Sequence, residues 1–309
     1  MLLVANGSVF TRNAQTPFIP NGAVAIDGDT IVEVGPECEL KAKYPDAEYV
    51  DAQGNLIMPG LINCHTHIYS GLARGLAIKG CNSTNFLENL EQQWWKIDDN
   101  LTLDGTKASA YATIQDSIRD GVATIFDHHA SFCEIPGSLF TIKDAAQELG
   151  MRSCLCYEVS DRRGQEKCDQ AIAENAEFAQ WAAKERRDND NHMIAAMPNV
   201  GWCEAMTMLF ENNAKMASKY FDRKLGVLEA GAAADVIVMD YKPFTPLSEE
   251  NIDGHMLFGM MGKNCRTTII NGRVLYKDRE FVGIDEDKIN AWIMAESKKL
   301  WSTLNDRAY

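Results

Sequence analysis

Short runs in which apolar and polar residues alternate dominate the first sixty positions of the chain. Residues 23–26 and 30–35 are two such runs, and the turn between them contains the pair Asp27-Gly28. Alternation with a period of two predicts half-buried strands, and an Asp-Gly pair between two of them predicts a hairpin. The pattern continues to position 60 without helical spacing, so this region is predicted to contain strands and turns only.

The pattern changes after Leu61, where apolar residues recur every three or four positions in longer segments. This spacing predicts amphipathic helices, and two of them stop near Gly121 and Gly150, as glycine favours at a helix C-terminus. The predicted helices cover residues 106–119, 141–149 and 166–184. The strands predicted between and after them cover residues 122–127, 151–157 and 192–197. Strands that alternate with helices indicate βαβ units and a parallel sheet.

Short strands return near the end of the chain, after one more amphipathic helix at residues 206–219. Residues 234–240 form an apolar run, and the pair Asn271-Gly272 predicts a second hairpin. A last helix is predicted at residues 285–304. The predicted fold class is α/β: a partial TIM-like (β/α) barrel of about four βα units, inserted in a β-sandwich that both termini form. The sandwich comprises residues 1–58 and 225–309, including the C-terminal helix, and the truncated barrel comprises residues 59–224.

Charge and composition narrow the class of partner. The chain has 309 residues and a formal net charge of −14, which argues against binding to nucleic acid or to an anionic membrane surface. The apolar runs are too short to span a bilayer, and the N-terminus does not read as a signal peptide. Nine cysteines without a C-x-x-C pair argue against a disulfide framework. These features predict a soluble cytoplasmic protein.

The sequence His65-Thr66-His67 closes the apolar run that begins near Asn55. Residues i and i+2 of a strand point to the same side, so the two imidazoles are expected to point the same way. Parallel barrels place their catalytic groups at the C-terminal ends of the strands, and neutral imidazole suits zinc or iron. Taken alone, an H-x-H sequence also fits two structural histidines.

The context of this motif resembles the amidohydrolase superfamily. Residues 58–67, MPGLINCHTH, resemble the first-strand motif of that superfamily, and residues 225–238 resemble its return into the sandwich. The hairpin at Asn271 matches its final strands. More narrowly, residues 127–131, 210–214 and 251–255 are similar to the SsnA-type aminohydrolase/chlorohydrolase subgroup.

The resemblance implies a chemistry. It implies one divalent metal, zinc first and iron second, with His65 and His67 among its ligands. In such enzymes a strand-five histidine and a strand-eight aspartate complete the ligand set, and a strand-six histidine with a nearby glutamate assists proton transfer. The expected activity is hydrolysis of a C–N bond, the deamination of a small nitrogen heterocycle, by water that the metal activates.

The sequence departs from this family pattern in its middle. A (β/α)8 barrel needs a minimum of about 200 residues. The interval from residue 60 to residue 225 is shorter than that. Strands five to eight are not visible, and no histidine lies between Met197 and Leu225, so no catalytic residue is identified. The expected seam is at residues 197–202. An inactive relative, and a non-catalytic module that forms a homodimer to cover open sheet edges, therefore remain alternatives.

The other four histidines carry weaker expectations. His128 and His129 end the second predicted barrel strand, and as neighbours on a strand they point to opposite sides, so one of them could face the barrel mouth. His129 is the candidate for contact with substrate, against a structural hydrogen bond. His192 and His255 are interpreted as structural. Trp94 and Trp95 fall in the long connection after the first barrel strand, where simple packing, a cap over the site and a dimer contact all remain open.

Overall fold

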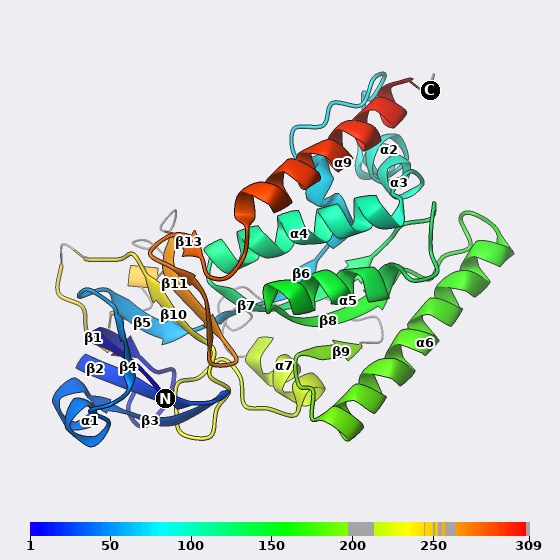
Figure 1. The fold of residues 1–309 in the computed structure, drawn as a ribbon. Helices are drawn as coiled ribbons and strands as arrows, with labels where there is room; N and C mark the ends of the chain where they lie inside the picture. Colours follow the sequence, from blue (N-terminus) through cyan, green and yellow to red (C-terminus); the bar gives the residue numbers. More distant parts are fainter. Residues whose placement is uncertain (197–212, 244, 250, 253–254, 257–263, 307–309) are drawn as a thin grey trace. The chain divides into compact units, whose positions relative to one another are not determined.

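The computed structural model describes residues 1–196, 213–243, 245–249, 251–252, 255–256 and 264–306 (Figure 1). The chain divides into two compact units, each built from three separate segments. Unit 1 comprises Met1–Asn63, Ser117–Thr124 and Cys203–Gly283. Unit 2 comprises Cys64–Asp116, Ile125–Trp202 and Ile284–Tyr309.

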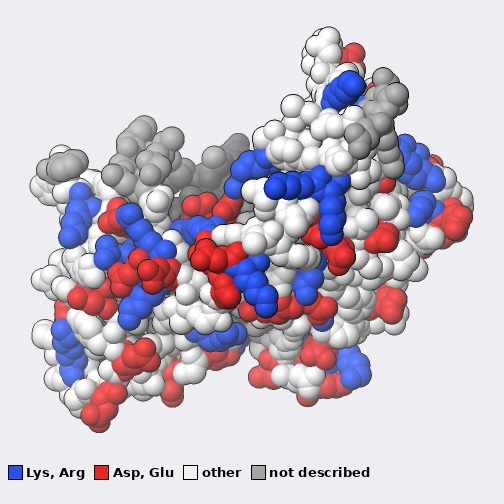
Figure 2. All heavy atoms as spheres, turned by 45° about the horizontal axis from the view of Figure 1, so that its top comes forward, with Lys and Arg blue, Asp and Glu red and all other residues white. Residues whose placement is uncertain are grey.

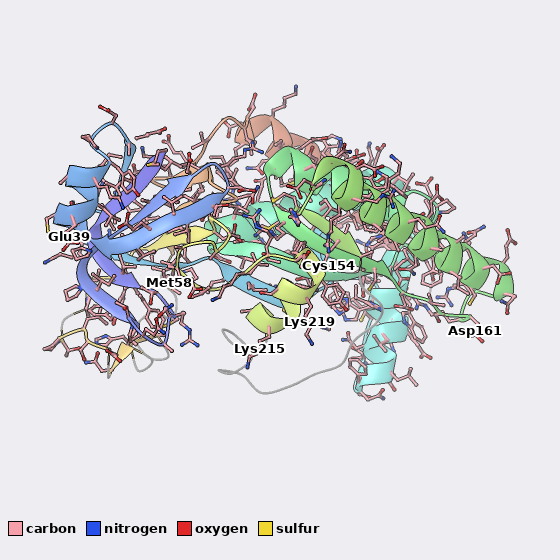
Figure 3. All side chains as sticks on the ribbon, turned by 90° about the horizontal axis from the view of Figure 1, so that it is seen from below. Glu39, Met58, Cys154, Asp161, Lys215 and Lys219 are labelled. Atoms are coloured by element: carbon pink, nitrogen blue, oxygen red, sulfur yellow. The ribbon has the colours of Figure 1, made fainter. Side chains whose placement is uncertain are left out.

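A nine-stranded sheet joins strands from both ends of the chain. Its order is β13-β12-β11-β10-β5-β1-β2-β3, with β4 beside β1. The strands are β1 (Leu2–Phe10), β2 (Phe18–Asp27), β3 (Thr30–Pro36), β4 (Glu48–Asp51), β5 (Leu56–Pro59), β10 (Val236–Met239), β11 (Cys265–Ile270), β12 (Arg273–Lys277) and β13 (Glu280–Phe281). The two ends meet where β5 and β10 pair antiparallel, with Met58 opposite Ile237 (Figure 3 labels Met58).

The two predicted hairpins are confirmed. β2 pairs antiparallel with β3, and β11 pairs antiparallel with β12. In the second hairpin Asn271 has φ 51° and Gly272 has φ 74°, the left-handed conformations that a two-residue turn with the twist of the flanking strands requires. A Cβ atom on Gly272 would lie 1.7 Å from the carbonyl oxygen of Gly28. The glycine therefore lets this turn approach the turn of the other hairpin.

One expectation for the N-terminal region is wrong, because helix α1 (Glu37–Lys43) lies between β3 and β4. Glutamates occupy its first turn and lysines its last, which is the charge order that the helix dipole favours. Only Leu40 is buried among its seven residues. A single buried position cannot show a helical period, so the apolar pattern failed to predict this helix.

A second sheet has the order β6-β7-β8-β9. Its strands are β6 (Leu61–Thr66), β7 (Val122–His129), β8 (Arg152–Tyr157) and β9 (Ile194–Ala196). The helices α4 (Leu103–Arg119), α5 (Ser138–Leu149) and α6 (Gln165–Asn189) connect them. β8 and β9 are parallel, and the predicted alternation of strands and helices is confirmed. The structure is therefore mixed α/β, with the bounds of its long elements close to those predicted.

The connection between β6 and α4 is mostly helical rather than an open loop. It contains η1 (Ile68–Ala73), α2 (Phe86–Asn89), η2 (Leu90–Trp94) and α3 (Trp95–Asp98). The C-terminal helix α9 (Glu286–Asp306) contributes Leu300 and Leu304 to a core cluster with Leu72 and Ile97. The indole N–H of Trp301 donates to the carbonyl of Leu72 at 2.7 Å. The last helix thus packs on the segment that follows the H-x-H strand.

Some expectations fall on residues outside the described part. The predicted seam at residues 197–202 lies there, and so does the first half of the helix predicted at residues 206–219, of which α7 (Asn213–Phe221) is described. Within the described ranges, no helix combines the length and the apolar character needed to cross a membrane. On the face drawn in Figure 2, acidic and basic side chains are interspersed.

We predict that Gly272→Ala costs unit 1 far more stability than Gly283→Ala. Both glycines have positive φ, 74° and 75°, so both substitutions carry about 1–2 kcal/mol of backbone strain. Only the Cβ at position 272 meets backbone, whereas nothing lies within 4 Å of one at position 283. In urea unfolding, Gly272→Ala should lose about 1–3 kcal/mol more unfolding free energy than Gly283→Ala. Equal losses would contradict the close approach of the two turns.

Candidate functional site

The strand that carries the H-x-H motif begins later than predicted. The apolar run from Asn55 was expected to be one strand, but it is divided at Gly60 between β5 and β6. The N–H of Gly60 donates to the carbonyl of Asp235 at 3.0 Å, and the N–H of Leu61 donates to the carbonyl of Gly121 at 2.9 Å. Two consecutive amides thus bond to different neighbours, which moves the chain from the first sheet into the second.

The structure brings the two candidate ligands together. The ring centroids of His65 and His67 lie 4.8 Å apart, edge to face. His65 is exposed and His67 is half-buried. β6 ends at Thr66, so His67 is the residue that precedes η1 rather than the last residue of the strand. The pair therefore lies at the C-terminal end of β6, where the sequence placed it.

The ring of His67 has a defined tautomer. Its Nδ1 lies 3.0 Å from the carbonyl oxygen of His128, and a carbonyl only accepts hydrogen bonds, so Nδ1 carries the proton. Burial lowers the pKa of His67 below its ordinary value, which favours the neutral ring. Nε2 then holds the lone pair. Metal-binding histidines commonly have one ring nitrogen fixed by a carbonyl in this way, so His67 fits the role of a metal ligand.

The described residues supply only part of a metal-binding set. Among them, no group of three or more histidine, cysteine, aspartate or glutamate side chains is arranged to hold a metal ion. The ring of His128 is 5.6 Å from that of His67, edge to face, and its backbone oxygen is what contacts His67. Because catalytic zinc normally has three protein ligands, His65 and His67 fit as two members of a larger set.

His128 and His129 lie in different environments at the end of β7. His128 is half-buried beside His67. His129 has 0% exposure, its Nε2 lies 2.9 Å from Oγ of Ser131, and the Tyr157 ring is 5.6 Å from its own. Burial lowers the pKa of His129 to about 3. The expected contact of His129 with substrate stays a prediction, and in this structure its ring contacts protein groups.

Asp127 also lies at this site, but no functional role was predicted for it from the sequence. Its side chain is fully buried, and Oδ1 accepts a hydrogen bond from the N–H of Ile68 at 2.6 Å. Its buried Oδ2 has no hydrogen-bond partner among the described atoms. Burial raises the pKa of Asp127 to about 8. An aspartate inside an apolar strand directly before two histidines is the signal that could have identified it.

A second cluster joins the segments that follow β6, β7 and β8. Arg162 contacts the carboxylates of Asp98, at 2.5 Å, and of Glu158. Its guanidinium lies 4.0 Å from the ring centroid of Phe132 and 5.2 Å from that of Trp95. Burial raises the pKa of Asp98 to about 7, although the charge of Arg162 acts in the opposite direction. One side chain thus ties together three connections at the same ends of the strands.

The remaining histidines contact groups away from the H-x-H pair. Nε2 of His192 lies 2.7 Å from a carboxylate oxygen of Asp190. In unit 1, the two ring nitrogens of His255 lie 2.5 Å from the hydroxyl of Tyr241 and 3.1 Å from the carbonyl of Pro246. On β8 both Cys154 and Cys156 are buried (Figure 3 labels Cys154), as expected of core residues.

The fold is mixed α/β. The candidate site lies at the carboxyl ends of β6, β7 and β8, where polar side chains gather. A family model described as "Amidohydrolase family" matches residues 56–220, more than half of the chain. A model described as "Imidazolonepropionase-like composite domain, bacteria" matches residues 22–47. The chain belongs to the amidohydrolase family.

Curated relatives are deaminases by name. The chain is 29% identical over 184 residues to a 5'-deoxyadenosine deaminase of Methanococcoides burtonii, covering 59% of this chain and 39% of that protein. It is 32% identical over 152 residues to a 5-methylthioadenosine/S-adenosylhomocysteine deaminase of Syntrophobacter fumaroxidans, covering 49% and 32%. The chain thus spans less than half the length of these relatives.

Solved structures share the fold. An atrazine chlorohydrolase from Arthrobacter aurescens TC1, solved with zinc, aligns with a TM-score of 0.65 at 16% identity, over 96% of this chain and 100% of that one. A guanine deaminase from E. coli aligns with a TM-score of 0.62 at 14% identity, over 90% and 100%. At such identities the likeness concerns the fold.

We predict that His129 makes the protein less stable in acid. The folded chain does not bind a proton at His129 until about pH 3, whereas an unfolded histidine binds one below about 6.5. The unfolded state therefore holds more protons in this window, and stability falls as the pH falls. Compared with His129→Gln, the wild type should lose on the order of 4 kcal/mol by about pH 3. Urea titrations of both proteins at several pH values measure this difference.

The comparison contains its own control. Asp98 and Asp127 are present in both proteins, so their raised pKa values cancel in the difference. A difference in unfolding free energy that stays constant from about pH 6.5 to about pH 3 would show that His129 is not held neutral by burial.

Proposed function

We propose that this chain derives from a metal-dependent hydrolase that cleaves a C–N bond, deaminating a small nitrogen heterocycle. The observation that carries the proposal is the His65–His67 pair, with the rings 4.8 Å apart and Nδ1 of His67 bonded to a carbonyl. Relatives named as deaminases of adenine nucleosides support the reaction. A structural neighbour solved with zinc supports a divalent metal, zinc first and iron second as the sequence resemblance implies.

His65 and His67 would hold the metal in this proposal. When bound, a divalent metal supplies Lewis-acid activation of water near neutral pH. His67 would contribute Nε2, since its Nδ1 proton is committed to the carbonyl of His128. Burial of the ring disfavours protonation, which would otherwise block that nitrogen.

The finer architecture belongs to the same proposal. Residues 59–224 would be a partial (β/α) barrel, and residues 1–58 and 225–309 would form the composite sandwich around it. The four strands β6 to β9 and the pairing of β5 with β10 support this division, whereas helix α9 belongs to unit 2, where it packs with Leu72 and Ile97. A cytoplasmic protein with a small-molecule substrate, related to the SsnA-type subgroup, is the matching biological setting.

A second candidate is a relative that does not turn over substrate in its 309-residue form. The observation that favours it is the incomplete ligand set, because no three-ligand group occurs in the described ranges. The 184 aligned residues are 39% of the Methanococcoides burtonii protein, which is longer than this chain. Pairing of its open strand edges in a homodimer remains part of this alternative.

We predict that His65→Ala and His67→Ala each weaken zinc binding by more than about 100-fold, since losing a ligand costs more than losing the group that supports it. Isothermal titration with zinc measures the affinity. His192→Ala is the matched control, because His192 contacts Asp190 rather than the H-x-H pair. Zinc binding that survives in both ligand variants would overturn the proposed site.

Ammonia release separates the two candidates. The zinc-loaded protein is incubated with 5'-deoxyadenosine, methylthioadenosine, S-adenosylhomocysteine and guanine. Release that depends on His65 supports the hydrolase. Zinc binding without release from any of these substrates supports the inactive relative.

A further inference from the structure

Two hydrogen bonds connect the C-terminal end of β7 to the turn that contains His67. The first is the carbonyl of His128, which accepts from Nδ1 of the His67 ring at 3.0 Å. The second is Oδ1 of Asp127, which accepts from the N–H of Ile68, the next residue after His67, at 2.6 Å. Two consecutive residues of one strand therefore fix both the ring of His67 and the peptide that follows it.

Other bonds complete the hold on this peptide. The carbonyl of Ile68 accepts from Oγ of Ser109 on α4 at 2.5 Å. The carbonyl of His67 accepts from the hydroxyl and the N–H of Ser70, at 2.7 and 3.0 Å. A Cβ on Gly71 would lie 2.6 Å from the carbonyl oxygen of Ser109, so η1 lies close against α4. Among these contacts of the described residues, Asp127 supplies the one carboxyl group, and its strand also supplies the bond to the ring.

We propose that Asp127 is a positioning residue for His67, whose bond to the Ile68 amide keeps the His67 ring on the His128 carbonyl and its Nε2 available to a ligand. The inference rests on the proposed function, because a metal is the ligand that would use Nε2. Without the bond at Ile68, the peptide after His67 can rotate and the ring loses its alignment with the carbonyl.

The burial of Asp127 fits this role. Asp127 has 0% exposure. Burying a carboxyl group costs folding free energy unless a hydrogen bond compensates for the lost water. Only one of its oxygens has a partner among the described atoms. A protonated Asp127 keeps Oδ1 as an acceptor, and so would an asparagine, whereas leucine of similar size removes the acceptor.

The test compares Asp127→Leu with Asp127→Asn by nitrogen NMR of the metal-free protein at about pH 8, where histidine rings are neutral. His67→Gln identifies the His67 signals. The wild type and Asp127→Asn should show the proton on Nδ1, and Asp127→Leu should show a mixture with the Nε2-protonated form. Zinc affinity should fall by about 10- to 100-fold in Asp127→Leu alone.

Glu174→Leu is the matched control for a merely structural effect. Glu174 is also a buried carboxyl group, and it accepts from the amides of Gly137 and Leu139 at 2.7 and 2.8 Å. Its removal should lower stability and leave the His67 tautomer unchanged.

The outcomes separate the two proposals. A folded Asp127→Leu protein with Nδ1 still fully protonated overturns the positioning role, whatever zinc does. Should Asp127→Leu not fold, loss of the Nδ1-protonated form in Asp127→Asn overturns it, because that variant retains the acceptor. A changed tautomer in Asp127→Leu together with a wild type that binds no zinc supports the positioning role and removes the proposed metal function.

Discussion

The site depends on one constraint: the backbone amides of Gly60 and Leu61 bond to residues that directly precede strands of two different sheets. The N–H of Gly60 bonds to Asp235, and the N–H of Leu61 bonds to Gly121. A Cβ on Gly60 would lie 2.5 Å from the Cβ of Ala123, so the absence of a side chain permits this approach. Because the chain changes sheets at this point, the strand that carries His65 begins at Leu61. Its end lies beside the end of β7, which supplies the groups that bond to His67 and Ile68.

Burial is the common cause of the unusual protonation states near these strand ends. It lowers the pKa of His129 to about 3 and raises that of Asp127 to about 8 and that of Asp98 to about 7. Each shift favours the neutral form, since desolvation penalises charge. Shifts of this kind gather at functional sites more often than elsewhere. The same shifts make stability depend on pH. The lowered pKa of His129 reduces stability as the pH falls, and the raised pKa values of Asp98 and Asp127 reduce it as the pH rises.

The sequence predicted the regular elements well and the local exceptions poorly. Long periodic segments such as α6 and turns with strong chemistry such as Asn271-Gly272 follow from local preferences, which the structure keeps. α1 was missed because seven residues with one buried position show no period. The division at Gly60 was missed because both β5 and β6 are apolar, and which neighbour each amide bonds to is decided by residues far along the chain.

The candidate site shows the same limit. The spacing of His65 and His67 predicted two neighbouring imidazoles at a strand end, and their ring centroids lie 4.8 Å apart, although β6 ends at Thr66 and His67 itself precedes η1. The bond between Asp127 and Ile68 joins residues that are 59 positions apart, and the Arg162 cluster joins three separate connections. No local period encodes such contacts. They became visible only when the sheet order brought the strand ends together.

Family membership and an incomplete ligand set are physically compatible. His65 and His67 come from one strand end, and the neighbouring strand orients His67 through its own backbone and Asp127. This half of a site is therefore preorganised by local contacts that need no group from elsewhere. Preorganisation removes an entropic cost from binding but supplies no third ligand, and the described residues contain no three-ligand group. The local geometry around His67 therefore does not depend on a third ligand among the described residues.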